Sequence, residues 1–312
     1  MITLEQLQAG IVLPIDKPRQ WTSFQAVNKV KAVVRNTYGH RDQSGAKADP
    51  NVGLKCDQSG AKAGPNVGLK CDQSGAKADN NVSLKKFKIG HAGTLDPLAT
   101  GLLLVCLGKA TKTIPTLQDG DKVYTGTFVF GATTPCYDLE LPIDHHYPYE
   151  HITPALLEQT LPQFTGTVMQ VPPMFSAVKI AGQRAYEYAR ADDPTVTIQP
   201  KPVNIYSFEI TAFRPGNPLG SETTQQQLNN SQLSTPNSQL YKNPLGTVPP
   251  HLPQADFRIH CGKGTYIRSI ARDLGLALGS GAFLSALRRE QIGSYTVANA
   301  LQLDQVEDYF IR

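Results

Sequence analysis

The chain has 312 residues, of which 40% are hydrophobic, and its formal net charge is +4. This is enough material for one large domain or two small ones, and a mildly basic balance permits a nucleic-acid partner without requiring one. The sequence contains no run of eighteen apolar residues and does not open with a basic-then-apolar leader, so we expect neither a membrane-spanning nor a secreted protein.

The cysteines are odd in number, and no two of them are spaced as Cys-x-x-Cys. That pattern is typical of reduced thiols in a cytosolic protein, and it disfavours a disulfide framework or a zinc site. We therefore expect a cytoplasmic protein without a bound metal ion. The cysteines are Cys56, Cys71, Cys106, Cys136 and Cys261.

The first predicted elements lie close to the N-terminus. An apolar segment over residues 10–14 leads into the tripeptide Asp16-Lys17-Pro18. Thr22 and Ser23 offer N-caps for a helix, because apolar residues recur after them at helical spacing. Lys17 is interpreted either as a solvated loop lysine or as a phosphate contact. The apolar face of the predicted helix consists of Phe24, Val27, Val30 and Val34.

Two stretches lack the composition of a folded core. Residues 41–85 are three consecutive 15-residue copies built on Asp-Gln-Ser-Gly-Ala-Lys-Ala, with few apolar residues. Ordering a backbone costs about 1 to 2 kcal/mol per residue, so we expect this segment to be a disordered insertion. Residues 215–254 are rich in Gln, Asn, Ser and Pro and predict a second, low-complexity insertion. The remaining roughly 227 residues are the size of one domain.

The stretch from Lys88 to Lys109 combines reactive side chains with a predicted buried strand. Two glycines flank His91, so the backbone can turn tightly there. Asp96 stands before a proline, and the unbroken apolar run over residues 102–107 predicts a buried strand. Asp before Pro is also typical of a helix start, and a histidine beside glycines is often a turn residue. The residues alone leave both side chains open between a catalytic and a structural role.

Three segments follow in the middle of the chain. Residues 123–130 have the β-branched and aromatic content of a strand, in which Tyr124 is read on its own as a packing residue. Residues 151–164 predict an amphipathic helix. Residues 172–190, which include Lys179, are basic and carry aromatic side chains. That stretch fits either an RNA backbone or an ordinary solvated helix face.

The last predicted elements are a strand, a glycine turn and a helix. Residues 255–261 alternate as a strand, and Thr265 is expected to cap the helix that follows. Tyr266 and Arg268 are placed in its first turn, away from the apolar face. A helix N-terminus that carries an arginine is a good anion site. The apolar face consists of Ile267, Ile270, Ala271, Leu274 and Leu278.

Residues 90–101 resemble the signature G-H-[TA]-G-[TA]-L-D-P-x-A-x-G of the TruB family of tRNA pseudouridine synthases. Further segments resemble other motifs of that family in the expected order, so the resemblance covers nearly all of the chain outside the two insertions. The chain departs from the motifs at Gln20 and Leu141, where glycine is usual, and at Cys136, where threonine is usual. The further segments are residues 16–23, 131–138, 172–179, 182–190, 264–269 and 284–289.

The resemblance implies an α+β pseudouridine synthase fold, with a mixed, largely antiparallel sheet, flanking helices and a central RNA-binding cleft. One catalytic domain would span residues 1–312, without the C-terminal PUA domain of many relatives. The implied reaction is isomerisation of uridine 55 in the T-arm of tRNA to pseudouridine, by base flipping and without a cofactor. Because the guide-RNA-dependent branch relies on the PUA domain, we expect a protein that acts without a guide RNA. We also expect it to be a monomer.

The resemblance also implies roles for individual residues. Asp96, Tyr124 and Arg268 would be catalytic: the arginine would pair with the carboxylate and hold it ionised, and Tyr124 would stack on the flipped uracil. His91 would pack against the RNA where the base has left. The residues expected to bind substrate are His91, Tyr266, Leu287, Lys17 and Lys179.

Two other classes of protein fit the same sequence. An RNA-binding relative that has lost catalysis would act as a tRNA folding chaperone, although an intact set of catalytic residues argues against it. Alternatively, the low-complexity insertions would tether other proteins and give the chain a scaffold role.

Overall fold

The computed structural model describes residues 2–39, 87–176, 178–180, 182–191, 197–216 and 247–311. The insertion expected at 41–85 and most of that expected at 215–254 lie outside these residues. The second prediction is wrong at its C-terminal end. Leu252 is buried in a cluster with Val129 and Phe283, and a strand begins at Gln254.

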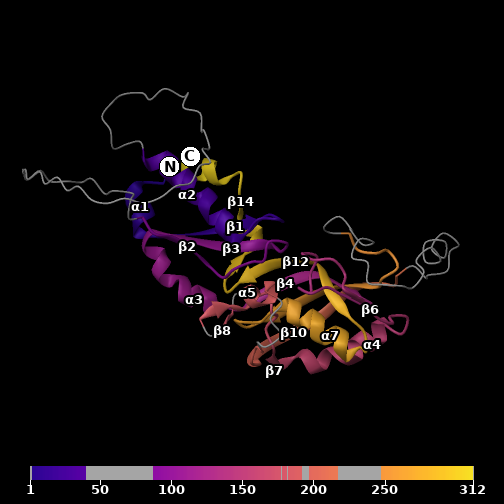
Figure 1. The fold of residues 1–312 in the computed structure, drawn as a ribbon. Coiled ribbons are helices and arrows are strands. Elements are labelled where there is room, and N and C mark those ends of the chain that lie inside the picture. Colours follow the sequence, from indigo (N-terminus) through magenta and orange to yellow (C-terminus); the bar gives the residue numbers. More distant parts are fainter. Residues whose placement is uncertain are drawn as a thin grey trace, which may run out of the picture.

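A mixed sheet of ten strands forms the centre of the molecule (Figure 1). Its strands are β1 (Ile11–Lys17), β2 (Ile89–Ala92), β3 (Thr100–Leu107), β4 (Lys122–Phe130), β7 (Gly166–Gln170), β10 (Lys201–Arg214), β11 (Gln254–Cys261), β12 (Ala282–Ile292), β13 (Tyr295–Thr296) and β14 (Leu301–Gln302). The order is β14-β1-β3-β12-β4-β11-β10-β7, with β2 paired to β3 and β13 to β12. Only β1 with β14 and β3 with β12 run parallel among the described strands. The expected mixed, largely antiparallel sheet is confirmed.

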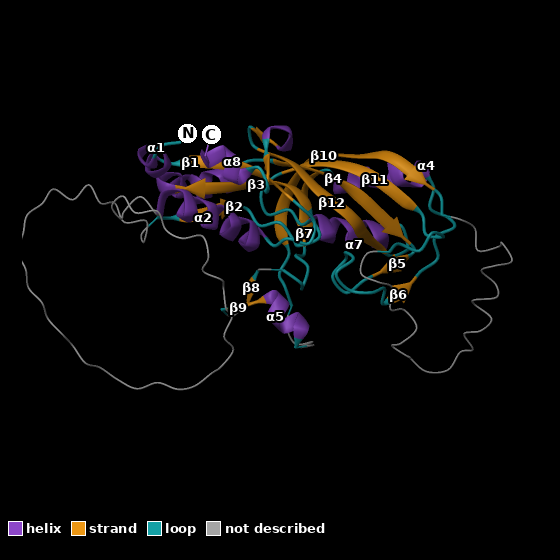
Figure 2. Ribbon diagram, turned by 90° about the horizontal axis from the view of Figure 1, so that it is seen from above, coloured by secondary structure: helices purple, strands orange, loops and turns teal. Residues whose placement is uncertain are grey.

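Helices and two small sheets surround this sheet. The helices are α1 (Leu4–Ala9), α2 (Ser23–Gly39), η3 (Gly108–Thr113), α3 (Ile114–Asp119), α4 (Pro154–Thr160), η4 (Leu161–Phe164), α5 (Ala185–Arg190), α7 (Ile267–Ala277), η5 (Val297–Asn299) and α8 (Val306–Ile311). The small sheets pair β5 (Ala132–Thr133) with β6 (His145–His146) and β8 (Lys179–Ile180) with β9 (Gln183–Arg184). Figure 2 shows β8, β9 and α5 standing off the main body. None of the described helices is long and apolar enough to cross a membrane.

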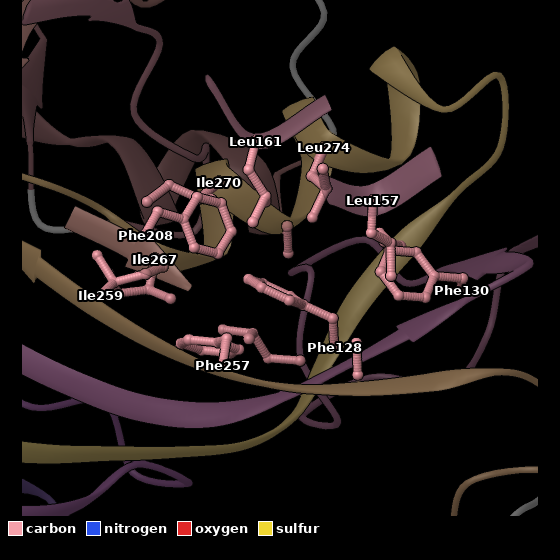
Figure 3. Packing of buried hydrophobic residues seen from close by; sticks show 14 of the residues in the cluster. Phe128, Phe130, Leu157, Leu161, Phe208, Phe257, Ile259, Ile267, Ile270 and Leu274 are labelled. Carbon is pink, nitrogen blue, oxygen red and sulfur yellow. The ribbon is translucent and has the colours of Figure 1, made fainter. Parts of the chain in front are cut away.

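The core is divided between two large clusters. One lies between α7, α4 and the strands β4, β10, β11 and β12, where the rings of Phe128 and Phe257 stack with centroids 4.1 Å apart (Figure 3). The other packs α2 and α8 against β1 and β3. Burying a side chain of this size stabilises a fold by about 1.5–3 kcal/mol. The two clusters hold opposite ends of the sheet, and the site described below lies on the strands and loops between them.

Three helix predictions are confirmed with corrections. In α2 the valines are buried as expected, but Phe24 is 70% exposed and its placement in the core was wrong. The helix expected over 151–164 is an α-helix that Thr153 caps, followed by a 3-10 turn. The N-cap position of α7 is Tyr266, and Thr265 does not cap the helix as expected: its hydroxyl donates to the carbonyl of Gly262 (3.0 Å).

Candidate functional site

Asp96 lies in the loop that joins β2 to β3. No helix begins at this residue; a turn closes behind it through a bond of 3.1 Å from the Ala99 N–H to the Asp96 carbonyl. Gly101 follows the loop with a φ of 97°, and a Cβ there would collide with the backbone of Arg289 on β12. Only glycine allows so close an approach of two strands. The loop is thus fixed at its exit by the backbone itself.

Arg268 meets Asp96 from the first turn of α7. Its Nε donates to Oδ2 of Asp96 at 2.9 Å, and its other nitrogens donate to the carbonyls of Cys136 (3.2 Å) and Phe175 (2.9 Å). The side chain of Arg268 is only 6% exposed, whereas that of Asp96 is 38% exposed. The expected pair is therefore present, and contrary to expectation the arginine points inward. The buried guanidinium of Arg268 therefore orients the carboxylate of Asp96, which remains partly open to solvent.

A second carboxylate shares this arginine. Oδ2 of Asp138 lies 3.7 Å from Nε of Arg268, and its Oδ1 accepts from the N–H of Glu140 (2.9 Å). Burial raises the pKa of Asp138, and the Arg268 guanidinium opposes that shift. The sequence assigned this residue no function. Its only signal was its place in a segment that departs from the family pattern at Cys136.

A cavity of about 660 Å³ opens in front of the Asp96 carboxylate. Tyr124 of β4, Tyr266 and Leu287 of β12 line it, as the resemblance led us to expect. Burial raises the pKa of both tyrosines, so the two phenols are neutral at pH 7. Further charged residues that line this cavity are Asp119, Lys122, Lys201, Lys263, Arg268 and Arg289.

His91 and Lys179, both expected to bind substrate, do not line this cavity. His91 is half-buried on β2, and burial lowers its pKa, so the imidazole is neutral at pH 7. Lys179 is exposed on β8, in the unit that stands off the sheet (Figure 2). The structure therefore places one on the strand that leads into the Asp96 loop and the other outside the main body.

Lys17 is not the surface cation that a phosphate contact requires. It is fully buried, and its ammonium donates to the carbonyls of Trp21 (2.6 Å), Pro18 (3.0 Å) and Pro97 (3.3 Å). Three acceptors satisfy the three donors of an ammonium group. The prediction that Lys17 contacts a phosphate is corrected accordingly: Lys17 binds the carbonyl of Pro97, the residue that follows Asp96, and anchors the loop from the protein interior.

Arg289 holds the other side of the same loop, and the sequence did not identify it. It is buried on β12 and donates to the carbonyls of Leu102 (2.8 Å), Gly93 (3.1 Å) and Thr94 (3.3 Å). Lys17 and Arg289 therefore bind backbone carbonyls on both sides of Asp96. Together they hold the backbone of the loop from which the Asp96 side chain projects.

The pH dependence of stability is expected to report the burial of Lys17. Burial lowers its pKa to about 8, against the opposing attraction of Asp96, while the unfolded chain keeps this proton up to about pH 10.5. Because the unfolded state binds more protons between these values, Lys17 makes the free energy of unfolding rise with pH there. Urea unfolding of the wild type and of Lys17→Met measures this effect. The free energy of unfolding of the wild type minus that of the variant should rise by about 2 kcal/mol from about pH 7.5 to 10. A constant difference would contradict this assignment.

Comparison with known proteins places this geometry in a family. The profile described as "TruB family pseudouridylate synthase (N terminal domain)" matches residues 81–231, and the "tRNA pseudouridylate synthase B C-terminal domain" matches residues 268–312. The tRNA pseudouridine synthase B of Flavobacterium johnsoniae is 41% identical over 307 residues, which cover 98% of this chain and 99% of that protein. The enzyme of the same name from Parabacteroides distasonis is 35% identical over 96% of this chain and 93% of its own.

Solved structures show the same fold at greater distance. A chain from the crystal structure of a Cbf5-Nop10-Gar1 complex matches with a TM-score of 0.53 and 21% identity, over 97% of this chain and 55% of that one. This likeness supports the fold alone. Identity across nearly the full length of the bacterial relatives carries the stronger conclusion: the chain belongs to the TruB family of pseudouridylate synthases.

Proposed function

We propose that this protein is a tRNA pseudouridine synthase that isomerises uridine 55 in the T-arm of tRNA. The observation that carries the proposal is the half-open carboxylate of Asp96, paired with buried Arg268 at a cavity walled by two tyrosines and a leucine. The names of the relatives support tRNA as the substrate. Position 55 follows from the family resemblance of the motifs around Asp96.

The reaction rearranges bonds within one nucleotide. The bond from N1 of uracil to C1′ of the ribose breaks, a bond from C5 to C1′ forms, the proton on C5 is lost to solvent, and N1 gains a proton. Because the base must leave its stack to turn over, the enzyme has to receive a flipped nucleotide. A cavity of about 660 Å³ with aromatic walls has room for a single base and its ribose.

The two carboxylate oxygens of Asp96 have different surroundings, which suggests different roles for them. Arg268 binds Oδ2 of Asp96, while Oδ1 forms no hydrogen bond within the described part of the chain. We assign Oδ1 to the reacting centre. The guanidinium of Arg268, 2.9 Å from Oδ2, also places a positive charge directly beside the carboxylate of Asp96. Tyr124 is assigned to stack on the uracil, with Tyr266 and Leu287 completing the pocket.

The charges around the cavity suit an RNA backbone. Five cationic side chains line the cavity: Lys122, Arg268 and Arg289 are buried, whereas Lys201 and Lys263 are exposed and can meet a phosphate. Lys263 also lies 2.8 Å from Asp119, one of the two carboxylates of the lining. Phosphate contacts of this kind position an RNA without reading its sequence. His91, beside the loop, is assigned to the RNA stack that the base leaves. Lys179 is assigned to the backbone outside the cavity.

Tritium release tests the proposal. A T-arm stem-loop carrying [5-³H]uridine only at position 55 is incubated with the purified chain alone, and release of tritium is followed alongside a stem-loop with cytidine at that position. We expect release from the uridine substrate only, which would also establish that the purified chain acts without a guide RNA. Tight binding without release, on full-length tRNA as well, would replace the proposal with the chaperone function.

A further inference from the structure

Two aromatic side chains are exposed where α2 begins. Trp21 is 36% exposed and Phe24 is 70% exposed, three residues apart. Phe24 has the helical spacing of the apolar face, yet it is exposed to solvent and does not pack in the core. Large aromatic groups at neighbouring surface positions mark a contact surface. We call Trp21 and Phe24 the aromatic pair.

The aromatic pair is fixed to the loop that carries Asp96. The ammonium of Lys17 binds the carbonyls of Trp21 and Pro97 together, and the N–H of Gln20 donates to the same Pro97 carbonyl (2.8 Å). The hydroxyl of Ser23 accepts from the N–H of Leu95 (2.8 Å). These bonds join residues 20–23 to residues 95–97 on both sides of Asp96. The aromatic pair therefore lies at a fixed position beside the catalytic loop.

A basic stripe continues from the aromatic pair along α2. Phe24, Lys31 and Arg35 are spaced by seven and four residues, which brings them to one face of the helix. No acidic residue occurs from Pro18 to Gly39; Arg35 and Arg19 are exposed, and Lys31 is half-buried. With 17 residues, α2 is about 25 Å long. A phosphate backbone matches a strip of this length and charge, whereas an apolar protein partner does not.

We infer that the aromatic pair stacks on unpaired RNA bases beside the flipped uridine, and that Lys31 and Arg35 bind phosphates of the RNA leading away from it. This inference rests on the proposed function, since it extends the same RNA site. Stacking on aromatic side chains accepts any base, because every base has a π-face. The surface would therefore strengthen binding of the substrate without selecting its sequence.

Equilibrium binding of fluorescein-labelled T-arm stem-loop, measured by anisotropy, tests the aromatic pair. All variants carry Asp96→Asn, so that no turnover occurs during the measurement. Trp21→Ala and Phe24→Ala are each expected to weaken binding about fivefold or more, in line with the loss of one stacked base. The matched control is Leu276→Ala on α7, which removes a side chain that is 66% exposed and should leave the Kd unchanged.

Salt dependence tests the basic stripe. The double variant Lys31→Glu, Arg35→Glu is expected to lower the slope of log K against log salt by about one for each phosphate that the protein no longer binds. Lys112→Glu, an exposed lysine on η3, controls for the general effect of reversing a charge. It should lower the slope by less than half as much per residue.

A Kd within twofold of the parent for both alanine variants, at an unchanged melting temperature, would overturn the inference. So would a dimer in size-exclusion chromatography that Phe24→Ala dissociates without any effect on RNA, because the surface would then bind a second copy of the chain. These readouts do not depend on turnover. If the variants respond as expected while the wild type releases no tritium, the proposed reaction fails and the RNA surface stands.

Discussion

Replacing Asp96 with asparagine is expected to lower the rate of tritium release by at least about 10⁴-fold. Asparagine keeps the size of the side chain and can still accept a hydrogen bond from Arg268, so the fold and the RNA affinity should persist. What it removes is the negative charge at Oδ1, which the proposed reaction requires. Single-turnover tritium release at saturating stem-loop measures this loss, and anisotropy of the same RNA verifies binding.

Asp138→Asn is the matched control for this experiment. Asp138 is the second carboxylate on Arg268, but it lies 3.7 Å from Nε and is almost fully buried, so it cannot reach substrate as Asp96 can. We expect this variant to keep measurable turnover and to lose some stability. Equal loss of activity in both variants would show that the carboxylate pair acts as a unit, and would remove the special role given to Asp96.

Long runs of one residue class made the sheet predictable. The apolar run over 102–107 and the β-branched and aromatic run over 123–130 lie within β3 and β4. Periodicity was less informative at helix ends. Phe24 has the correct spacing for the apolar face of α2, but its position in the first turn carries it past the edge of the core. A repeat of 3.6 residues gives a direction around the axis and does not reveal where the neighbouring element stops.

The polar part of the site was harder to predict, because its partners are remote in sequence. Arg268 looked like an exposed residue of an amphipathic helix, yet it is buried because Asp96, 172 residues away, and two loop carbonyls satisfy it. Lys17 is buried for the same reason by a carbonyl 80 residues away. Arg289 lies in a segment that resembles a family motif, but nothing in the sequence showed that it binds the Asp96 loop. The family resemblance identified the residues that line the pocket. The role of Lys17 and Arg289 in holding the loop became visible only in the folded structure.

Arg268→Lys is expected to lower turnover by about 10²- to 10³-fold even though it keeps the charge. The guanidinium reaches Asp96 and the carbonyls of Cys136 and Phe175 with three different nitrogens. A lysine ammonium is a single point and cannot span these acceptors. Two buried carbonyls would then lose their donors, so we also expect the free energy of unfolding to fall by about 2 kcal/mol or more.

Arg272→Lys, one helical turn further along α7, separates this effect from the general cost of replacing an arginine. Arg272 bonds to its neighbour Asp273 (2.7 Å) and to the carbonyl of Val171 (3.0 Å), and within the described residues it makes no hydrogen bond to Asp96. Tritium release should therefore stay within about threefold of the wild type in Arg272→Lys. If Arg268→Lys retained comparable activity, charge alone would suffice at this position, and the forked geometry would not be what aims the Asp96 carboxylate at the substrate.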